Sequence, residues 1–166
     1  MTVTAPAPVS RAAGTAYRTE LSPVSFLRRS AYVYPDKVAV VHGERHITYR
    51  EFGERVNRLA SALAAAGIEP GDRVAFVAPN IPALLEAHYG VPAAGAVLVT
   101  INTRLGRDEV AYILEHSGAR MVFADHELAH VVEGAGLPTI RISQSPEPSP
   151  AGSHSSGPGT RGGGSA

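Results

Sequence analysis

The feature that most constrains the fold is a regular alternation of apolar runs and helical patterns over residues 73–142. Residues 73–78, 96–101 and 120–124 are short, largely apolar runs, and the stretches between them repeat apolar residues at helical spacing. Continuous apolar strands joined by helices through short connections are typical of a parallel sheet covered on both faces. The sequence therefore predicts the α/β fold class.

Helices are expected between and after these strands: one that begins after Asn80 and carries Leu84, Leu85 and Val91, one over residues 107–117 and one over 127–133. A further strand is expected over residues 139–142. Asn80 is expected to cap the first helix, and Pro92 is expected to kink it. Gly118 is expected to close the second helix, because glycine readily adopts the left-handed conformation that ends a helix.

A smaller unit is expected before the sheet. Ser22 followed by Pro23 predicts a helix start, and the helix should end before Pro35. One face of this helix is expected to carry Val24, Leu27, Ala31 and Tyr34. Residues 37–42 and 46–48 then read as two strands around a tight turn, which predicts a small hairpin.

The most specific local signal is the pair Thr48 and Glu51. A Thr followed three residues later by Glu is a capping box, in which each side chain hydrogen-bonds the other residue's backbone amide. The helix that it opens should end near Gly67 and bury one stripe, made of Phe52, Val56, Leu59, Ala60 and Leu63.

Composition excludes several classes of protein. Lys+Arg and Asp+Glu both number 15, so the net charge of zero argues against a nucleic-acid partner. The chain has no cysteine, which excludes disulfides, thiolate zinc sites and cysteine nucleophiles. The longest run without Asp, Glu, Lys or Arg, residues 87–103, is too short and too interrupted by Gly and Pro to span a membrane. We therefore expect no membrane partner and a cytoplasmic location.

Three zones of composition divide the chain. Residues 1–19 are rich in Ala, Thr and Pro, residues 20–142 carry the apolar patterns, and residues 143–166 are rich in Ser, Gly and Pro. The first and last zones lack the apolar side chains needed to offset chain entropy, so both are expected to be disordered. The middle zone is the expected folded subdomain.

Several segments in that zone resemble one family. Residues 47–52 (ITYREF) look like the first core motif of the adenylate-forming ligases, residues 71–75 (GDRVA) are similar to a strand entry of that family, and residues 92–102 resemble its second core motif. The continuation, with Thr103-Arg104-Leu105, Glu109, Ile113 and Leu114, is most similar to the acyl-CoA synthetase branch. The chain is thus identified as similar to the N-terminal portion of an AMP-binding synthetase.

The resemblance implies a reaction and its cofactors. In that family a carboxylate attacks the α-phosphate of ATP to give an acyl-adenylate, and coenzyme A then displaces AMP; Mg²⁺ assists. The family's Gly- and Thr-rich phosphate loop, adenine motif and C-terminal catalytic Lys have no counterpart in this sequence. We therefore predict that the chain holds no catalytic, cofactor-binding or metal residue, and that it is inactive alone. A frameshift or premature stop after the Ile142 codon is the accompanying hypothesis.

The polar residues that stand at family motifs have a simpler interpretation. Side chains of their types satisfy free amides at helix ends and turns, so they are expected to be capping or turn residues: Thr48, Asn80, Asn102 and Thr103. Residues 157–164 are glycine-rich but contain no Lys, no preceding strand and no following helix, so a flexible tail is predicted there rather than a phosphate loop.

Two alternatives remain open. The chain could be a non-catalytic interaction module, or one half of a split ligase whose partner chain carries the catalytic part. In either case apolar surface left uncovered would favour self-association. Binding of a partner that restores ATP–pyrophosphate exchange would separate the split ligase from an inactive fragment.

A remote alternative is a small zinc hydrolase. His126, Glu127 and His130 match the His-Glu-x-x-His pattern, which on an α-helix places two imidazoles on one face for zinc and uses the Glu as a general base. However, Asp125 is expected to cap this short helix, and no third ligand follows at the required spacing. The sequence therefore favours a capped strand-to-helix junction over a metal site.

Overall fold

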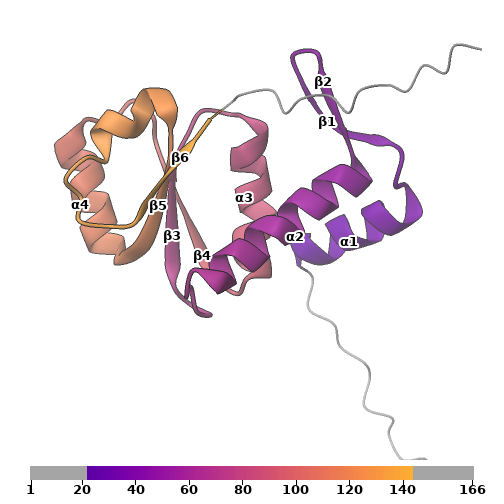
Figure 1. The fold of residues 1–166 in the computed structure, drawn as a ribbon, viewed down its shortest axis with the longest axis horizontal. Coiled ribbons are helices and arrows are strands. Elements are labelled where there is room, and N and C mark those ends of the chain that lie inside the picture. The colour runs from indigo at the N-terminus through magenta and orange to yellow at the C-terminus, as the bar shows by residue number, and fades with distance from the viewer. Residues whose placement is uncertain (1–21, 144–166) are drawn as a thin grey trace, which may run out of the picture.

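A computed structural model describes residues 22–143, and its centre is a parallel sheet of four strands (Figure 1). In sequence order the strands are β3 (Arg73–Val77), β4 (Val97–Ile101), β5 (Ala119–Asp125) and β6 (Thr139–Ile142). Their order across the sheet is β4-β3-β5-β6, with all neighbours parallel. The chain therefore leaves β3 for β4 on one side and returns to β5 on the other.

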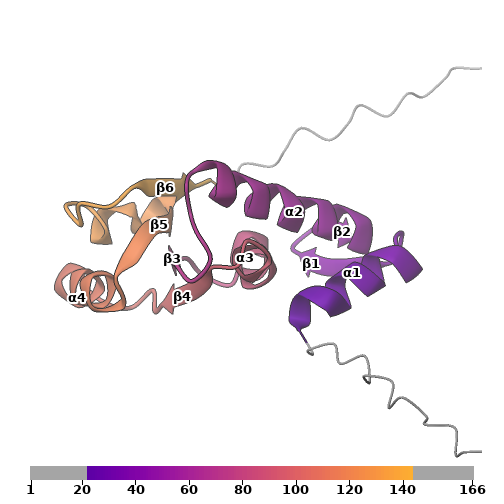
Figure 2. The same cartoon turned by 90° about the horizontal axis from the view of Figure 1, so that it is seen from below.

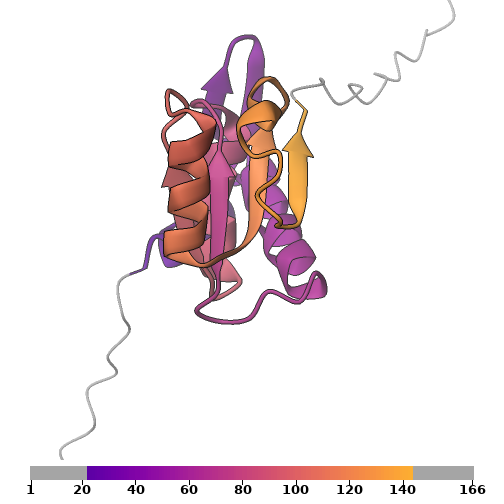
Figure 3. The same cartoon turned by 90° about the vertical axis from the view of Figure 1, so that its left-hand side faces the viewer.

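Helices cover both faces of this sheet, as the sequence predicted. On one face lie α2 (Tyr49–Ala65) and α3 (Pro82–Ala93); on the other lie α4 (Arg107–Ser117) and the short 3₁₀ helix η1 (His126–Val131) (Figures 1 and 3). Alternate strand residues point to the two cores. Phe76 packs toward α2 and α3 and stacks on Phe123 at 4.5 Å between ring centroids, while Val77 and Val122 pack toward α4.

A second, smaller lobe packs against the N-terminal part of α2. It contains α1 (Pro23–Val33) and an antiparallel hairpin of β1 (Val38–His42) and β2 (Arg45–Thr48). Its core consists of Leu27 from α1, Ile47 from the hairpin, and Phe52 and Val56 from α2. Figure 2 shows that α2 runs along both lobes and so joins them. We call this smaller unit the hairpin lobe and the larger unit the sheet lobe.

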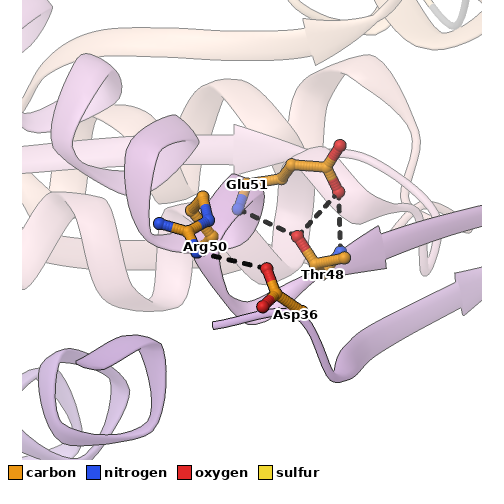
Figure 4. Close-up of polar contacts among 4 residues, drawn as sticks. All are labelled: Asp36, Thr48, Arg50 and Glu51. Carbon is orange, nitrogen blue, oxygen red and sulfur yellow. Dashed lines mark hydrogen bonds and ion pairs between the residues drawn. The ribbon is translucent and has the colours of Figure 1, made fainter. Parts of the chain in front are cut away.

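The predicted capping box forms at the junction between the hairpin and α2 (Figure 4). The Glu51 N–H donates to Thr48 Oγ1 at 3.3 Å, and Glu51 Oε2 accepts from the Thr48 N–H at 2.7 Å. At the other end Gly67, with φ of +80°, follows the cap residue Ala66. The Ile68 N–H then donates to the Leu63 carbonyl, so the end of the helix satisfies its own backbone groups.

One expectation about a helix boundary is wrong. Asn80 does not cap α3: the cap position belongs to Ile81, which precedes Pro82, and no side chain bonds there. Proline at the first helical position needs no capped amide of its own and already has helical φ, which explains why the helix begins there. Pro92 lies in the last turn of α3, which ends one residue later, at Ala93.

Other differences concern exposure and helix type. Tyr34 is the exposed residue that ends α1 and does not join the Leu27 face. The run at 96–101 is apolar, yet β4 is an edge strand and is mostly half-buried or exposed. The helix expected over 127–133 is the 3₁₀ helix η1. The tails expected at 1–19 and 143–166 lie, apart from Ser143, outside the described residues.

Candidate functional site

The candidate site is the edge of the sheet where the parallel strands end. In open α/β sheets, ligands bind in crevices outside the carboxyl ends of the strands, where successive connections leave toward opposite faces. Here the connection after β3 leads to α3, and the connections after β4 and β5 lead to α4 and η1 on the other face. Figure 3 shows that the hairpin rises at this same edge.

Two adjoining hollows lie along this edge, and together we call them the C-edge groove. The first, of 280 Å³, lies between the hairpin and the start of α3, and the second, of 610 Å³, lies at the ends of β3 and β4. Asn80, Leu84 and His88 line both hollows, which makes the groove continuous. The remaining lining of the first hollow is mostly apolar, and that of the second includes Thr100, Asn102 and Thr103.

Two polar side chains in the groove make local hydrogen bonds. Asn102 Oδ1 accepts the Arg104 N–H at 3.0 Å, which fixes the turn after β4. His88 Nδ1 lies 2.8 Å from the Leu84 carbonyl, one turn earlier in α3. These contacts confirm the turn role expected for Asn102, just as the capping box confirms the role expected for Thr48. Thr103 also lies in the turn, whereas Asn80 lines the groove without capping α3.

Asp125 stands at the carboxyl end of β5 and is 1% exposed. Its Oδ1 accepts the Glu127 N–H at 3.1 Å, so it caps η1 as the sequence predicted. Its Oδ2 is buried and has no hydrogen-bond partner within the described part of the chain. A buried acceptor without a donor costs about 1–3 kcal/mol, more when it is charged. The structure thus contains one unsatisfied oxygen at the candidate edge.

The geometry of the His-Glu-x-x-His segment argues against zinc. Residues 126–131 form a 3₁₀ helix, in which positions four apart differ by roughly 120° around the axis, so His126 and His130 do not share a face. His130 Nδ1 contacts the Glu127 carbonyl at 3.0 Å, and Glu133 faces Arg107. Within residues 22–143 no three His, Asp or Glu side chains are close enough to hold a metal.

Phosphate binding would need a particular set of groups. A phosphate cradle needs consecutive backbone amides and a basic side chain, and Mg²⁺ needs carboxylates placed beside them. The single lysine of the sequence, Lys37, lies at the base of the hairpin with its ammonium 4.7 Å from the centre of the Tyr34 ring. We assign no catalytic step to this part of the chain.

The capping box also changes the pKa of its carboxyl group. Hydrogen bonds from the Thr48 backbone and hydroxyl lower the pKa of Glu51, with smaller contributions from Arg45 and Arg55. These bonds favour the carboxylate form and belong to helix capping rather than to a reaction. The same junction carries an exposed ion pair between Arg50 and Asp36 at 3.1 Å (Figure 4).

Sequence reasoning missed one polar pair in the interior. Arg55 Nε of α2 donates to Glu86 Oε1 of α3 at 2.6 Å, with side chains 20% and 10% exposed. The pair joins the two helices that cover one face of the sheet. The only signal in the sequence was an acid within the apolar face of α3, and a single acid does not identify its partner.

Comparisons with known proteins identify relatives of the chain. The family model described as AMP-binding enzyme matches residues 27–160. A peroxisomal acetate/butyrate–CoA ligase of Arabidopsis thaliana is 48% identical over 115 residues, which are 69% of this chain and 20% of that ligase. The chain thus spans about a fifth of that relative's length.

Solved structures agree with this result. A benzoate CoA ligase from Burkholderia xenovorans superposes with a TM-score of 0.68 and 34% identity, over 72% of this chain and 25% of that one. The N-terminal domain of FACL13 from Mycobacterium tuberculosis gives a TM-score of 0.68 and 35% identity, over 72% of this chain and 33% of that domain. No helix within residues 22–143 is long and apolar enough to cross a membrane.

Proposed function

The chain belongs to the AMP-binding enzyme family, and on this premise we propose that it forms the N-terminal part of an AMP-forming acyl-CoA ligase. The parent reaction activates a carboxylic acid with ATP to an acyl-adenylate and then transfers the acyl group to coenzyme A. The observation that carries the proposal is the 48% identity to a CoA ligase over 115 residues.

The contribution of this chain to that reaction is a scaffold. The sheet lobe holds the loops after β3, β4 and β5 at one edge through packing on both faces. Rigid elements of this kind position the groups of a binding site better than isolated loops do. The groups that bind ATP, Mg²⁺ and coenzyme A belong to other parts of the ligase, so this polypeptide alone has no adenylation activity.

The acid substrate is proposed only at the level of its class. One relative is named for acetate and butyrate, and one structural neighbour is named for benzoate. Aliphatic and aromatic acids are therefore both represented among similar proteins. We propose a carboxylic acid, with fatty-acid activation as the metabolic setting.

The test is to measure ATP–pyrophosphate exchange in two proteins. The first is the 166-residue chain alone, which should show no exchange with acetate, butyrate or benzoate. The second is the Burkholderia benzoate CoA ligase with its aligned segment replaced by residues 22–143 of this chain, which should retain benzoate-dependent exchange. A matched graft with Phe76→Asp, which places a charge in the sheet core, is the control for loss of folding.

Either of two results would contradict the proposal. ATP–pyrophosphate exchange by the chain alone would mean that its residues, to which we give only a scaffold role, include catalytic groups. A graft that unfolds cooperatively but lacks exchange would show that the chain cannot serve as the N-terminal part of a ligase.

A further inference from the structure

A separate hollow of 270 Å³ lies between α1 and α2, where the hairpin lobe packs against the longer helix. We call it the helix groove. It shares no lining residue with either hollow of the C-edge groove. Figure 2 shows the two helices in contact at the end of the molecule that carries the hairpin. The helix groove is therefore a surface distinct from the edge of the sheet.

Each helix lines this groove with one of its faces. On both helices the lining residues recur at positions i, i+3, i+4 and i+7, which is the spacing of neighbours along one side of a helix. They are Val24, Leu27, Arg28 and Ala31 of α1, and Arg50, Gly53, Glu54 and Asn57 of α2, joined by Val56. Leu27 and Val56 are buried, so the floor of the groove is apolar.

Gly53 leaves space between the two helices. A Cβ at this position would meet the Ala31 Cβ of α1 at 3.4 Å, which is an ordinary van der Waals contact. Glycine is unfavourable in the interior of a helix relative to alanine. Here its lack of a side chain keeps the groove deeper than alanine would.

Two charges of opposite sign stand on the walls of the groove. Arg28 of α1 and Glu54 of α2 are both exposed, and neither forms an ion pair or a side-chain hydrogen bond within residues 22–143. The other arginine of the lining, Arg50, is paired with Asp36 at 3.1 Å, as Figure 4 shows. The walls therefore offer one guanidinium and one carboxylate, on opposite helices, above an apolar floor.

This combination selects among small ligands by their charge. An aliphatic carboxylate would be attracted by Arg28 but repelled by Glu54, and an aliphatic amine would meet the reverse. A molecule that carries a carboxylate and an ammonium group on one carbon, beside an apolar side chain, matches both walls and the floor. Concave sites of apolar lining with a few convergent polar groups are typical of small-molecule sites.

We propose that the helix groove binds a free α-amino acid with an aliphatic side chain. Arg28 binds the carboxylate of this ligand, Glu54 binds its ammonium group, and the aliphatic side chain lies on Val24 and Leu27. Because both charged residues are exposed, the affinity is modest, with a Kd in the millimolar range. The proposal does not depend on the proposed function, since it concerns neither the sheet edge nor adenylation.

The test is a titration of the isotope-labelled 166-residue chain with L-leucine, followed by NMR. The reporters are the backbone amides of Ala31 and Gly53, which face each other across the groove. Isocaproate, which lacks the ammonium group, and isoamylamine, which lacks the carboxylate, are titrated in the same way. L-leucine should shift both amides saturably, and each analogue should bind about tenfold more weakly or worse.

Two pairs of variants identify the charged groups. Arg28→Gln and Glu54→Gln should each weaken L-leucine binding by about tenfold. Arg29→Gln, on the neighbouring residue of α1, and Glu115→Gln, on the exposed side of α4, are the matched controls. Neither control residue lines the groove, so each control should change the Kd by less than about twofold.

A further variant separates loss of binding from loss of folding. Gly53→Ala places a methyl group against Ala31 and so narrows the groove, which should weaken L-leucine binding by about threefold or more. The same substitution favours the helix, so its Tm should be unchanged or higher than that of the wild type. Weaker binding by a protein of undiminished stability would assign the loss to the groove itself.

Four results would overturn the proposal. One is the absence of a saturable shift at Ala31 and Gly53, and another is isocaproate or isoamylamine binding as tightly as L-leucine. The third is an equal loss of affinity in Arg28→Gln and Arg29→Gln. The fourth is a shift of these amides that follows the protein concentration but not L-leucine, which would assign the groove to a second copy of the chain. Each leaves the proposed function to its own test, ATP–pyrophosphate exchange in the ligase graft.

Discussion

The sheet lobe and the hairpin lobe both contain many aliphatic and aromatic side chains, but they differ in how large a share of these side chains is buried. In the sheet lobe, helices on both faces bury the side chains of the two central strands. In the hairpin lobe, four buried residues form the core, while aromatic and aliphatic side chains of α1 and β1 remain exposed: Phe26, Tyr32, Val33, Tyr34, Val38 and Val41. The sheet lobe also exposes Leu85, Val97, Tyr112 and Ile140, but the hairpin lobe buries a smaller share of its large apolar side chains.

The largest expected effect is in the core of the sheet lobe. Phe76→Ala removes a buried ring that stacks on Phe123, and truncation of a buried Phe costs about 3–5 kcal/mol of unfolding free energy. Val41→Ala in the hairpin should cost less than about 0.5 kcal/mol, because its side chain is already exposed. Urea unfolding of both variants measures this contrast, and equal losses would mean that the lobes are equally well packed.

The second effect concerns the contact between α2 and α3. Glu86→Ala leaves Arg55 partly buried without this partner and should reduce the unfolding free energy by about 2 kcal/mol. Asp36→Ala breaks the exposed pair with Arg50 and should change it by less than about 0.5 kcal/mol. Thermal and urea unfolding at neutral pH provide both values. A larger loss of unfolding free energy for Asp36→Ala than for Glu86→Ala would contradict this ranking of the two ion pairs.

A smaller effect is expected at the junction of the two lobes. Thr48→Ala removes the side chain that accepts the Glu51 N–H at the start of α2, and the loss of such a cap costs about 1 kcal/mol. Thr48→Ser keeps the oxygen and is the matched control. If both substitutions were equally destabilising, the methyl group rather than the cap would be responsible.

The smallest effect is a dependence on pH. The Thr48 hydrogen bonds hold the pKa of Glu51 below its ordinary value of 4.5, so the unfolded state takes up a proton before the folded state does as the pH falls. The stability that this carboxylate contributes is present above 4.5 and is lost as the pH falls through the lower, folded-state pKa. Because the group is exposed, the contribution is small.

The check for this last effect is the unfolding free energy of the wild type minus that of Glu51→Gln. The difference should be positive at neutral pH and should shrink in acid, below the folded-state pKa. Glu54→Gln on the same helix serves as the control. A difference that grows in acid would have the wrong sign for a carboxylate of lowered pKa.

The sequence predicted the elements that depend on neighbouring residues. Thr48 and Glu51 form their cap, Gly67 and Gly118 end helices in the left-handed conformation, and the strand and helix order is as expected. These features are local, since a cap or a glycine at a helix end needs only its own turn. The alternation of apolar runs also identified the α/β class without any knowledge of the strand order.

Features that depend on distant parts of the chain could not be predicted. Periodicity does not reveal that β4 is an edge strand, because an apolar run looks the same at an edge and at the centre. The Arg55–Glu86 pair joins residues on different helices. Whether the buried Asp125 Oδ2 finds a hydrogen-bond donor depends on residues that are distant in the sequence. The resemblance to a ligase family identified the scaffold, whereas the C-edge groove could be found only in the structure.

The most direct test of the contrast between the lobes is native-state hydrogen exchange on the 166-residue chain alone. We predict that backbone amides of β3 and β5 exchange only through global unfolding, while those of β1 and β2 exchange through local opening at a markedly lower free energy. Uniform protection across both lobes would contradict this prediction, because the hairpin lobe would then be as stable against local opening as the sheet lobe.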